Sequence, residues 1–279
     1  MSVDAHSSDR DVFTVRRPVR KVLEGAVRAE EDWVAVEAPL EVWIGGQPVT
    51  VMMRTPGHDE ELVRGFLFNE GMIRSIDDVV SIAPVEAADV DAAVGGSVIA
   101  VELAGGNPAP KADRLFYSNS SCGVCGKQSI ASLEVHGEIV TSAFAIERRT
   151  LVSLPDRLRA AQSTFARTGG VHASGMFTAD GSLIVVREDV GRHNALDKIA
   201  GWALAERLMP LADCLLLLSG RVSYELVQKA VAAGIPVIAA VGAPSSLAIQ
   251  IADQFNITLA GFLRPGGMNV YTHPDRIRE

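Results

Sequence analysis

Cysteine is scarce in this sequence, with three residues among 279: Cys122, Cys125 and Cys214. This number is too small for the disulfide framework of a small secreted protein. Residues 1–20 also lack the apolar segment of a secretory signal peptide. We therefore expect a cytoplasmic protein, in which an exposed cysteine pair reacts rather than cross-links the chain.

A surplus of positive charge is also absent. The chain has 26 Lys and Arg against 34 Asp and Glu, which gives a net charge of −8. This balance argues against a general binder of nucleic acid or of anionic membranes. The apolar fraction of 48% is ordinary for a folded protein, and the chain is long enough for one large or two modest domains.

One uncharged run, residues 230–252, is long enough to span a bilayer. It contains Gly234, Pro236, Gly242 and Pro244, which would interrupt a membrane helix. We interpret the run as a helix end, a buried strand, a turn and the start of another helix, and we expect no membrane segment.

The first half of the chain predicts a small mixed α+β domain, residues 31–147, behind a partly ordered arm, residues 1–30. The arm carries one short strand signal at residues 12–17. The domain is expected to contain a hairpin that turns at Gly45-Gly46, a helix, a later strand, and a second helix after the cysteine loop. These elements are expected at residues 40–44, 49–53, 59–71 and 98–103, and from about residue 127.

Residues 148–279 predict an α/β domain. Helical and β segments alternate, and the strands after residue 210 are continuous apolar runs, as in a parallel sheet with helices on both faces. An Asp180-Gly181 turn signal joins two earlier strands. Helices are expected at residues 155–167, 193–208, 223–233 and 245–253, and strands at 171–177, 183–187, 214–218, 236–241 and 258–263.

Three short turns follow the last three predicted strands, at residues 219–221, 242–246 and 264–267. The carboxyl ends of parallel strands form the ligand-binding edge of an open sheet. Each turn has glycine, two have arginine, and Ser245 or Ser246 could cap a helix whose amides favour an anion. The turns predict a site for a ligand with phosphate or pyrophosphate. Alternatively their glycines and serines only turn and cap the chain, because none matches a GxGxxG or P-loop motif.

Residues 187–198 are dense in ionisable groups. They form either a helix start with solvated charges, capped by Asp189 or Asn194, or the floor of a polar site with Asp189 or His193 facing a ligand. His172 has the same two interpretations: a site residue, or a histidine satisfied within its strand.

The pair Cys122-Gly123-Val124-Cys125 has several chemical interpretations. A structural zinc site needs four ligands, and only scattered histidines could complete one here. A zinc deaminase is excluded, because His172-Ala173-Ser174 lacks the glutamate of the H-x-E motif. A thioredoxin-type dithiol follows the first strand of a βαβ unit, and no such unit is predicted before Cys122.

A sulfur carrier is a further interpretation of this pair. Lys127 and the helix expected after the loop would favour the thiolate of Cys122 or Cys125. A thiolate on a loop can accept a sulfur atom as a persulfide and pass it on, by the nucleophilic attack that also drives thiol–disulfide exchange.

Several longer motifs occur in order along most of the chain. They are TPGHDEEL at residues 55–62, SCGVCG at 121–126, TGGVH at 168–172, REDVGRHNALDK at 187–198, and FLRPG at 262–266 with YTH at 271–273. Together they resemble the formate dehydrogenase accessory sulfurtransferase (FdhD) family, over about residues 15–275. Several long motifs are more specific than a CxxC pair alone.

The resemblance implies a function. Members of the family take sulfur from a cysteine desulfurase and deliver it to the bis-molybdopterin guanine dinucleotide form of the molybdenum cofactor, which formate dehydrogenase needs. The family's persulfide cysteine matches Cys122, and Cys125 is the second member of the pair. The cofactor-contacting stretch matches Phe262, Leu263, Arg264, Pro265, Gly266 and Gly267.

The resemblance also implies a fold and an assembly. The C-terminal domain of the family resembles the three-layer cytidine deaminase fold without its metal site, and family members tend to form homodimers. We therefore expect sulfur transfer through Cys122, with Cys125 as assistant or relay and the three turns holding the guanine dinucleotide. The alternatives are a molybdenum-cofactor-binding chaperone that moves no sulfur, and a free-standing redox dithiol.

Overall fold

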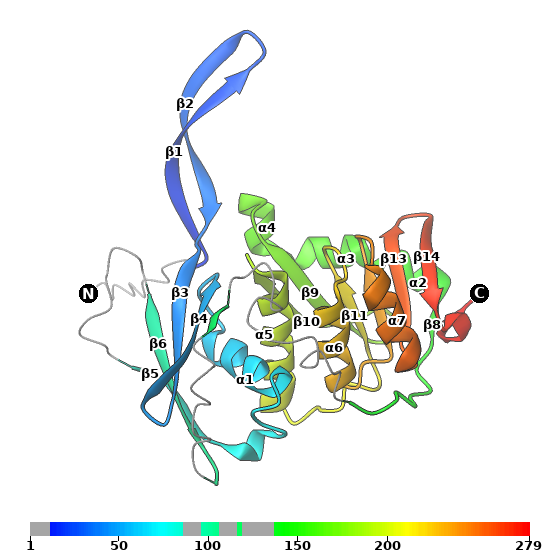
Figure 1. Ribbon diagram of the computed structural model, residues 1–279. Coiled ribbons are helices and arrows are strands. Elements are labelled where there is room, and N and C mark those ends of the chain that lie inside the picture. The colour runs from blue at the N-terminus through cyan, green and yellow to red at the C-terminus, as the bar shows by residue number, and fades with distance from the viewer. Residues whose placement is uncertain (1–11, 86–95, 106–115, 119–136) are drawn as a thin grey trace, which may run out of the picture.

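Two large β-sheets, one from each half of the chain, lie on either side of a pair of crossed helices in the computed structural model (Figure 1). The structure describes residues 12–85, 96–105, 116–118 and 137–279. The five-stranded N-terminal sheet packs on α1 (Asp59–Asn69), the six-stranded C-terminal sheet packs on α5 (Arg192–Ala205), and the two helices contact each other. The mixed α/β class is thereby confirmed.

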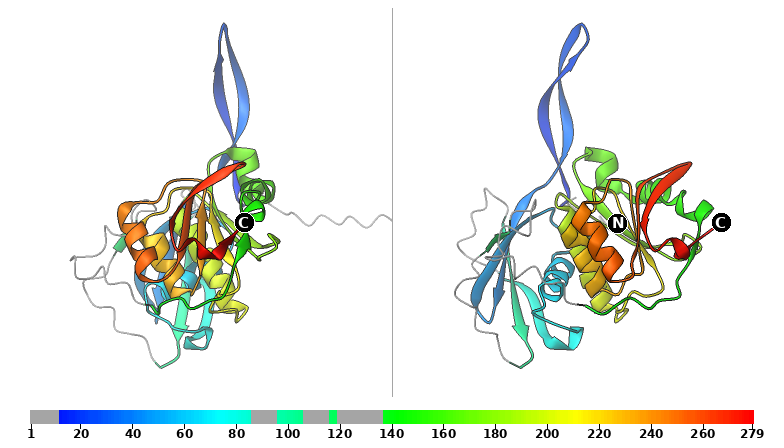
Figure 2. Two further views of the ribbon diagram at one scale, coloured as in Figure 1. Left: turned by 90° about the vertical axis from the view of Figure 1, so that its right-hand side faces the viewer. Right: turned by 45° about the vertical axis from the view of Figure 1, so that its right-hand side comes forward.

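A long hairpin, β1 (Thr14–Leu23) and β2 (Ala26–Ala35), stands away from the body (Figures 1 and 2). Ten residue pairs hold it together, and Gly25 turns it with a φ of 78°. The sequence predicts only one short strand in this arm. The second strand escapes prediction because most residues of the hairpin are exposed, so no apolar face marks it.

The N-terminal sheet has the strand order β5-β6-β3-β4-β7. Leu40 and Val42 are buried against Leu62 and Leu67 of α1, as the alternating pattern predicts. The predicted hairpin, helix and later strand are confirmed, and the helix expected after residue 127 lies outside the described residues. The elements are β3 (Ala38–Ile44), β4 (Gln47–Arg54), a 3-10 turn (Ile76–Asp78), β5 (Val79–Val85), β6 (Ser97–Leu103) and β7 (Phe116–Ser118).

The C-terminal sheet has the strand order β10-β9-β11-β12-β13-β14, in which β11, β12 and β13 are parallel. The predicted alternation is confirmed to within a few residues at each end. The strands are β9 (His172–Phe177), β10 (Leu183–Asp189), β11 (Leu215–Leu218), β12 (Val237–Ala240), β13 (Thr258–Arg264) and β14 (Gly267–Thr272), and the helices after α5 are α6 (Tyr224–Ala232) and α7 (Ser246–Gln254).

Both faces of this sheet are buried, which explains its continuous apolar strands. Leu216 and Leu218 pack with α5, α6 and α7, whereas Leu215 and Leu217 pack on the opposite face. The opposite face is covered by α2 (Arg148–Leu151) and α3 (Leu154–Ala161), as Figure 1 shows. The uncharged run 230–252 forms the end of α6, β12, a turn and most of α7, as predicted.

Four features of the C-terminal half differ from the prediction, and the first is the helix α2, which the sequence does not predict. The helix expected at 155–167 is two helices, α3 and α4 (Ser163–Thr168), because Gln162 leaves helical geometry with a ψ of 80°. The edge strand β14 was not predicted, and neither was the short pair β8 (Ile146–Glu147) and β15 (Ile277–Arg278). No helix within the described residues has both the length and the apolar character needed to cross a membrane.

Candidate functional site

The carboxyl ends of β11, β12 and β13 share the edge that lies uppermost in Figure 1. The turns after β11 and β12 are joined, because the amide of Gly242 donates to the carbonyl of Gly220 at 3.1 Å. The amide of Phe262 in turn donates to the carbonyl of Gly242 at 3.1 Å. The structure therefore brings two of the predicted turns together and places Phe262 beside them, while residues 264–267 form the turn between β13 and β14 beyond.

Part of this edge serves the fold itself. A Cβ atom on Gly242 would lie 2.7 Å from the carbonyl oxygen of Gly220, so glycine is needed for backbone packing. Ser245 caps α7, because its Oγ accepts from the amide of Ala248 at 3.2 Å. Backbone packing therefore explains Gly242, and helix capping explains Ser245. Arg221 and Ser246 are exposed at the same edge.

Phe262 has an unusual backbone for an aromatic residue. Its φ is 53°, in the left-handed region, and its side chain is 41% exposed. This conformation costs a bulky residue about 1–2 kcal/mol. A solvent-facing aromatic ring is suited to stacking on a planar group.

The other residues of the predicted cofactor stretch divide by exposure. Leu263 is 1% exposed and packs in the core, so its side chain is structural. Arg264, Pro265 and Gly266 are exposed, and Gly266 has a φ of 90° at the hairpin turn. The stretch therefore presents one ring, one guanidinium and an open glycine backbone.

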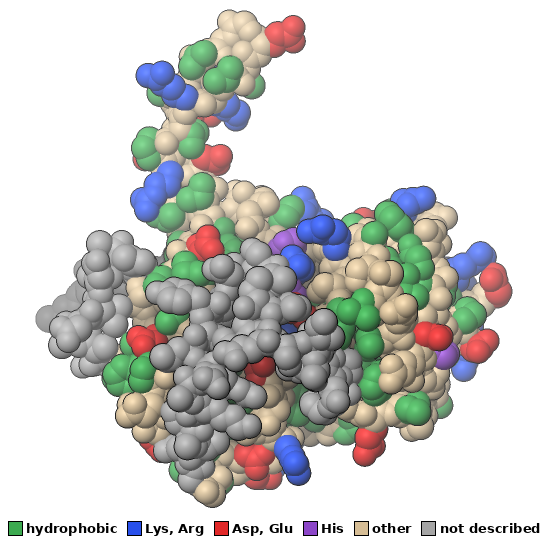
Figure 3. Space-filling view, viewed as in Figure 1, with side chains coloured by type: hydrophobic (Ala, Val, Ile, Leu, Met, Phe, Trp, Pro, Cys, Tyr) green, Lys and Arg blue, Asp and Glu red, His purple; other side chains and the backbone are tan. Residues whose placement is uncertain are grey.

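A group of basic side chains lies next to the joined turns. The ring of His172, at the start of β9, rests on Gly220, where a Cβ atom would lie 3.2 Å from Nδ1. Burial lowers the pKa of His172, as do the positive charges of Arg192, His193 and Arg221, while Asp189 opposes them. Figure 3 shows blue and purple side chains gathered at the upper centre of this face.

Arg192 begins α5 and has a buried Nε atom with no hydrogen-bond partner among the described residues. His193, the next residue, is buried and contacts the start of α6. Its Nε2 lies 2.8 Å from a carboxylate oxygen of Glu225 and 3.2 Å from Oγ of Ser223. Sequence reasoning proposed His172 and His193 as site residues, but it missed Arg192, which only the helix geometry distinguishes from its charged neighbours.

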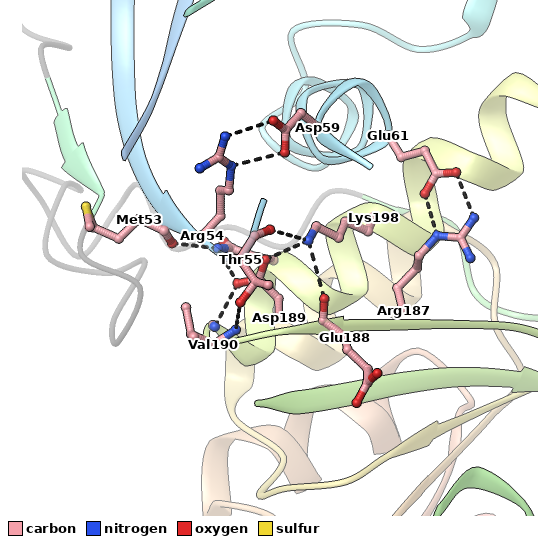
Figure 4. A network of polar contacts seen from close by, with 12 residues as sticks. Met53, Arg54, Thr55, Asp59, Glu61, Arg187, Glu188, Asp189, Val190 and Lys198 are labelled. Carbon is pink, nitrogen blue, oxygen red and sulfur yellow. Dashed lines mark hydrogen bonds and ion pairs between the residues drawn. The ribbon is translucent and has the colours of Figure 1, made fainter. Parts of the chain in front are cut away.

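Asp189 fits neither interpretation given by the sequence. Asp189 and Lys198 are both 0% exposed, and Lys198 Nζ lies 2.8 Å from a carboxylate oxygen of Asp189 (Figure 4). Burial raises the pKa of Asp189, and the charge of Lys198 opposes that shift. The side chains of the pair do not face solvent.

The Asp189–Lys198 pair instead ties the two halves of the chain together. The amide of Thr55, after β4, donates to Asp189 at 3.1 Å, and Lys198 donates to the carbonyl of Thr55 at 2.9 Å. Beside them, Arg187 forms a bidentate ion pair with Glu61 of α1 (Figure 4). Two of the sequence motifs, 55–62 and 187–198, therefore meet in one structural joint.

The predicted persulfide residues Cys122 and Cys125 lie outside the described residues. Cys214 is 6% exposed, and burial raises the pKa of its thiol to about 12. Such a thiol is protonated near neutral pH and a poor nucleophile. Among the residues that the structure describes, no three His, Cys, Asp or Glu side chains gather to hold a metal ion.

Comparisons with known proteins give a consistent result. Residues 35–278 match the model of the FdhD/NarQ family. A protein of Mycolicibacterium paratuberculosis named "Sulfur carrier protein FdhD" is 48% identical over 268 residues, which are 95% of this chain and 98% of the relative. A protein of the same name from Sulfolobus acidocaldarius is 42% identical over 259 residues, covering 93% of this chain and 96% of the relative.

One solved structure supports the fold. A crystal structure from Desulfotalea psychrophila, provisionally named a formate dehydrogenase accessory protein, superposes with a TM-score of 0.75. It covers 95% of this chain and 99% of its own, at 24% sequence identity. At this identity the likeness establishes the arrangement of the elements.

Proposed function

Because this chain belongs to the FdhD/NarQ family, we propose that it is a sulfur carrier that serves formate dehydrogenase. The observation that carries the proposal is the name "Sulfur carrier protein FdhD", borne by relatives 42–48% identical over nearly their full length. In this function a cysteine desulfurase supplies the sulfur, and the bis-molybdopterin guanine dinucleotide form of the molybdenum cofactor receives it.

Cys122 is the proposed carrier residue. Its thiolate attacks the terminal sulfur of the desulfurase persulfide, the desulfurase thiolate leaves, and a persulfide forms on Cys122 without net oxidation. Delivery as sulfide follows if the thiolate of Cys125 attacks Sγ of Cys122, which forms a disulfide between them and releases the terminal sulfur. An external dithiol then reduces that disulfide. The buried, protonated Cys214 takes no part.

The acceptor is proposed to bind at the carboxyl edge of the C-terminal sheet. The exposed ring of Phe262 supports contact with a guanine base, and Arg264 and Arg221 supply positive charge for the phosphates beside the ring of His172. The backbone of residues 265–267 completes the contact. A cytidine-deaminase-like three-layer C-terminal domain, a homodimer and a cytoplasmic location belong to the same proposal.

The direct test is persulfide formation. The protein is incubated with a cysteine desulfurase and labelled cysteine, and the peptide that contains Cys122 and Cys125 is examined by mass spectrometry. We expect a reductant-sensitive gain of one sulfur atom, lost in Cys122→Ala and retained in the control Cys214→Ala. An active desulfurase that leaves the wild-type peptide unmodified would contradict sulfur transfer.

The cellular test uses a strain that lacks the gene for this protein. Cys122→Ala should fail to restore formate dehydrogenase activity, although its thermal unfolding midpoint matches the wild type. Full activity with this variant would exclude Cys122 as the carrier and favour the chaperone that binds cofactor without moving sulfur.

A further inference from the structure

We propose that the hairpin β1–β2 is a docking arm for formate dehydrogenase, and that it seats this enzyme over the carboxyl edge of the C-terminal sheet. The identity of the partner rests on the proposed function. The docking arm itself follows from the position of the hairpin, from its exposed apolar tip and from the charges beside that tip. The partner surface that fits it is an apolar socket bordered by carboxylates.

The base of the hairpin is fixed next to the carboxyl edge. The Trp33 ring of β2 lies between the guanidinium groups of Arg16, at 4.8 Å, and of Arg167 in α4, at 4.1 Å. Ala35, the last residue of β2, has its methyl group 3.5 Å from the place of a Cβ atom on Gly170, just before β9. The hairpin therefore rises from the side of the molecule that carries this edge, as Figure 1 shows.

The length of the hairpin suits contact with a globular protein. Ten residues in each strand span about 30 Å at about 3.4 Å per residue, which is near the diameter of a small domain. A protein of that size that binds the tip also faces the carboxyl edge at the base. Residues 14–35 match in number the roughly 20–30 residues that one side of a standard interface contributes.

The tip of the hairpin exposes aliphatic side chains on both of its faces. Val22 and Val27 are opposite each other and are 74% and 64% exposed. Leu23, opposite Ala26 in the next pair, is 47% exposed. Neighbouring pairs point to opposite faces of a β-ribbon, so the tip is apolar all round. Such a tip suits a socket that surrounds it, and a partner that covers it stabilises a two-stranded ribbon that is marginally stable alone.

Positive charge borders the apolar tip. Arg20 and Arg28 form no ion pair within the part of the chain that the structure describes. Lys21 lies 3.6 Å from Glu30 but directly opposite Arg28, and like charges in opposite positions destabilise a hairpin. Carboxylates on a partner relieve this repulsion and guide the two proteins together.

Two other occupants fit the hairpin less well. An anionic bilayer attracts the cations, but it repels Glu24 at the turn and the consecutive acidic residues 30–32 of β2. A second copy of this chain brings an identical tip, whose cations repel those of the first. The base of the hairpin borders the edge where the acceptor is proposed to bind, which favours the enzyme that takes up what is bound there.

The probe is formate dehydrogenase purified from a strain that lacks the gene for this protein. Biolayer interferometry with the full-length protein gives the association and dissociation rates. In Val22→Ser/Val27→Ser the dissociation rate should rise by at least about tenfold, because two apolar contacts are lost. The control Val80→Ser replaces a valine of β5 that is 69% exposed and should leave both rates unchanged.

The charges beside the tip are tested separately. Arg20→Gln/Arg28→Gln should slow association by at least about fivefold at low ionic strength and flatten its dependence on salt. The control Arg148→Gln removes an exposed arginine of α2 and should bind like the wild type. Equal thermal midpoints of the variants and the wild type exclude loss of the fold as the cause of weaker binding.

The tip variant Val22→Ser/Val27→Ser should still acquire a persulfide on Cys122 at the wild-type rate. Loss of that persulfide would assign the hairpin to the desulfurase and overturn the inference. So would a formate dehydrogenase that does not bind, or that binds the tip variant at wild-type rates. A tip variant that loses only a dimer in light scattering, or only binding to phosphatidylglycerol vesicles, would assign the hairpin to a second copy or to a membrane.

The inference and the proposed function fail in different ways. A persulfide on wild-type Cys122 together with enzyme binding that ignores the tip would leave the sulfur carrier standing without this arm. Binding through the tip with no persulfide on the wild type would keep the arm and remove the sulfur-carrier function.

Discussion

Asp189 and Lys198 have ionisable side chains, but their role in this protein is structural. Both bear ionisable groups in a motif rich in charge, yet both are completely buried and bonded to each other and to Thr55. A buried ion pair adds little stability over a well-packed apolar pair, but removal of one partner leaves the other charge uncompensated. Their role in this structure is to hold two halves of the chain in one geometry.

Lys198→Met should destabilise the protein by about 3–5 kcal/mol, because Asp189 would remain buried without its counter-ion. Urea unfolding followed by circular dichroism measures this free energy. The double variant Asp189→Leu/Lys198→Met should recover part of the loss, and Lys21→Met, at an exposed position, should change stability by less than about 0.5 kcal/mol. A single variant as stable as the wild type would show that the pair is dispensable.

Sequence reasoning located the residues of this pair but not their function. The hydrogen bond between Thr55 and Asp189 joins positions 134 residues apart, and no local pattern encodes such a partner. Phe262 is a similar case, since an aromatic residue gives no signal for left-handed backbone. By contrast the convergence of residues 219–221 and 242–246 followed from the parallel strands, which their apolar runs predicted.

At the scale of elements, α1 and α5 cross at two glycines. A Cβ atom on Gly65 would lie 1.8 Å from the carbonyl oxygen of Asp197, and one on Gly201 would lie 1.8 Å from that of Glu61. The backbones of the two helices are therefore in direct contact. No other side chain fits at either position without separating the helices.

Gly65→Ala and Gly201→Ala should each destabilise the protein by more than about 2 kcal/mol, because the added methyl group meets backbone. This sign is opposite to the gain of about 1 kcal/mol that alanine normally brings to a helix interior. Chemical unfolding measures both variants, with exposed Gln250→Ala of α7 as the control expected within about 0.5 kcal/mol. A stabilised Gly65→Ala would show that the helices are farther apart than described.

Elements were predictable from sequence where they bury a face. One buried face gives the alternating apolar residues Leu40, Val42 and Ile44 of β3. Two buried faces give the uninterrupted apolar run Leu215–Leu218 of β11. The hairpin β1–β2 and the edge strand β14 bury little, so burial leaves no pattern in their sequences. Prediction failed at the periphery of the fold for that reason.

At the scale of the molecule, the crossed helices and the Asp189–Lys198 joint connect the two sheets, so the halves should unfold together. Trp43 lies in the N-terminal sheet and Trp202 in α5, against the C-terminal sheet. Variants that keep only one of these tryptophans should show urea midpoints that coincide within about 0.3 M. Midpoints that differ clearly would reveal two independently unfolding units.

The stability of the whole chain should also depend on pH through its histidines. Burial and nearby positive charges lower the pKa of His58 and of His172, so below about pH 6.5 the unfolded chain binds more protons than the folded one. Stability is then fully present above that pH and is lost as the pH falls. The thermal midpoint should fall less between about pH 7.5 and pH 5.5 in His58→Gln/His172→Gln than in the wild type. An unchanged fall would assign it to carboxylates.

The hairpin β1–β2 has a consequence for how the protein behaves at high concentration. Among the strands that the structure describes, none pairs with β1 or β2 from outside the hairpin. Both long edges therefore present open backbone amides and carbonyls that strands of neighbouring molecules could extend into a continuous sheet. Pro18 removes one donor from β1, and five basic and four acidic side chains line the hairpin from residue 14 to 35. Charged side chains and a proline on an edge strand oppose such edge-to-edge pairing.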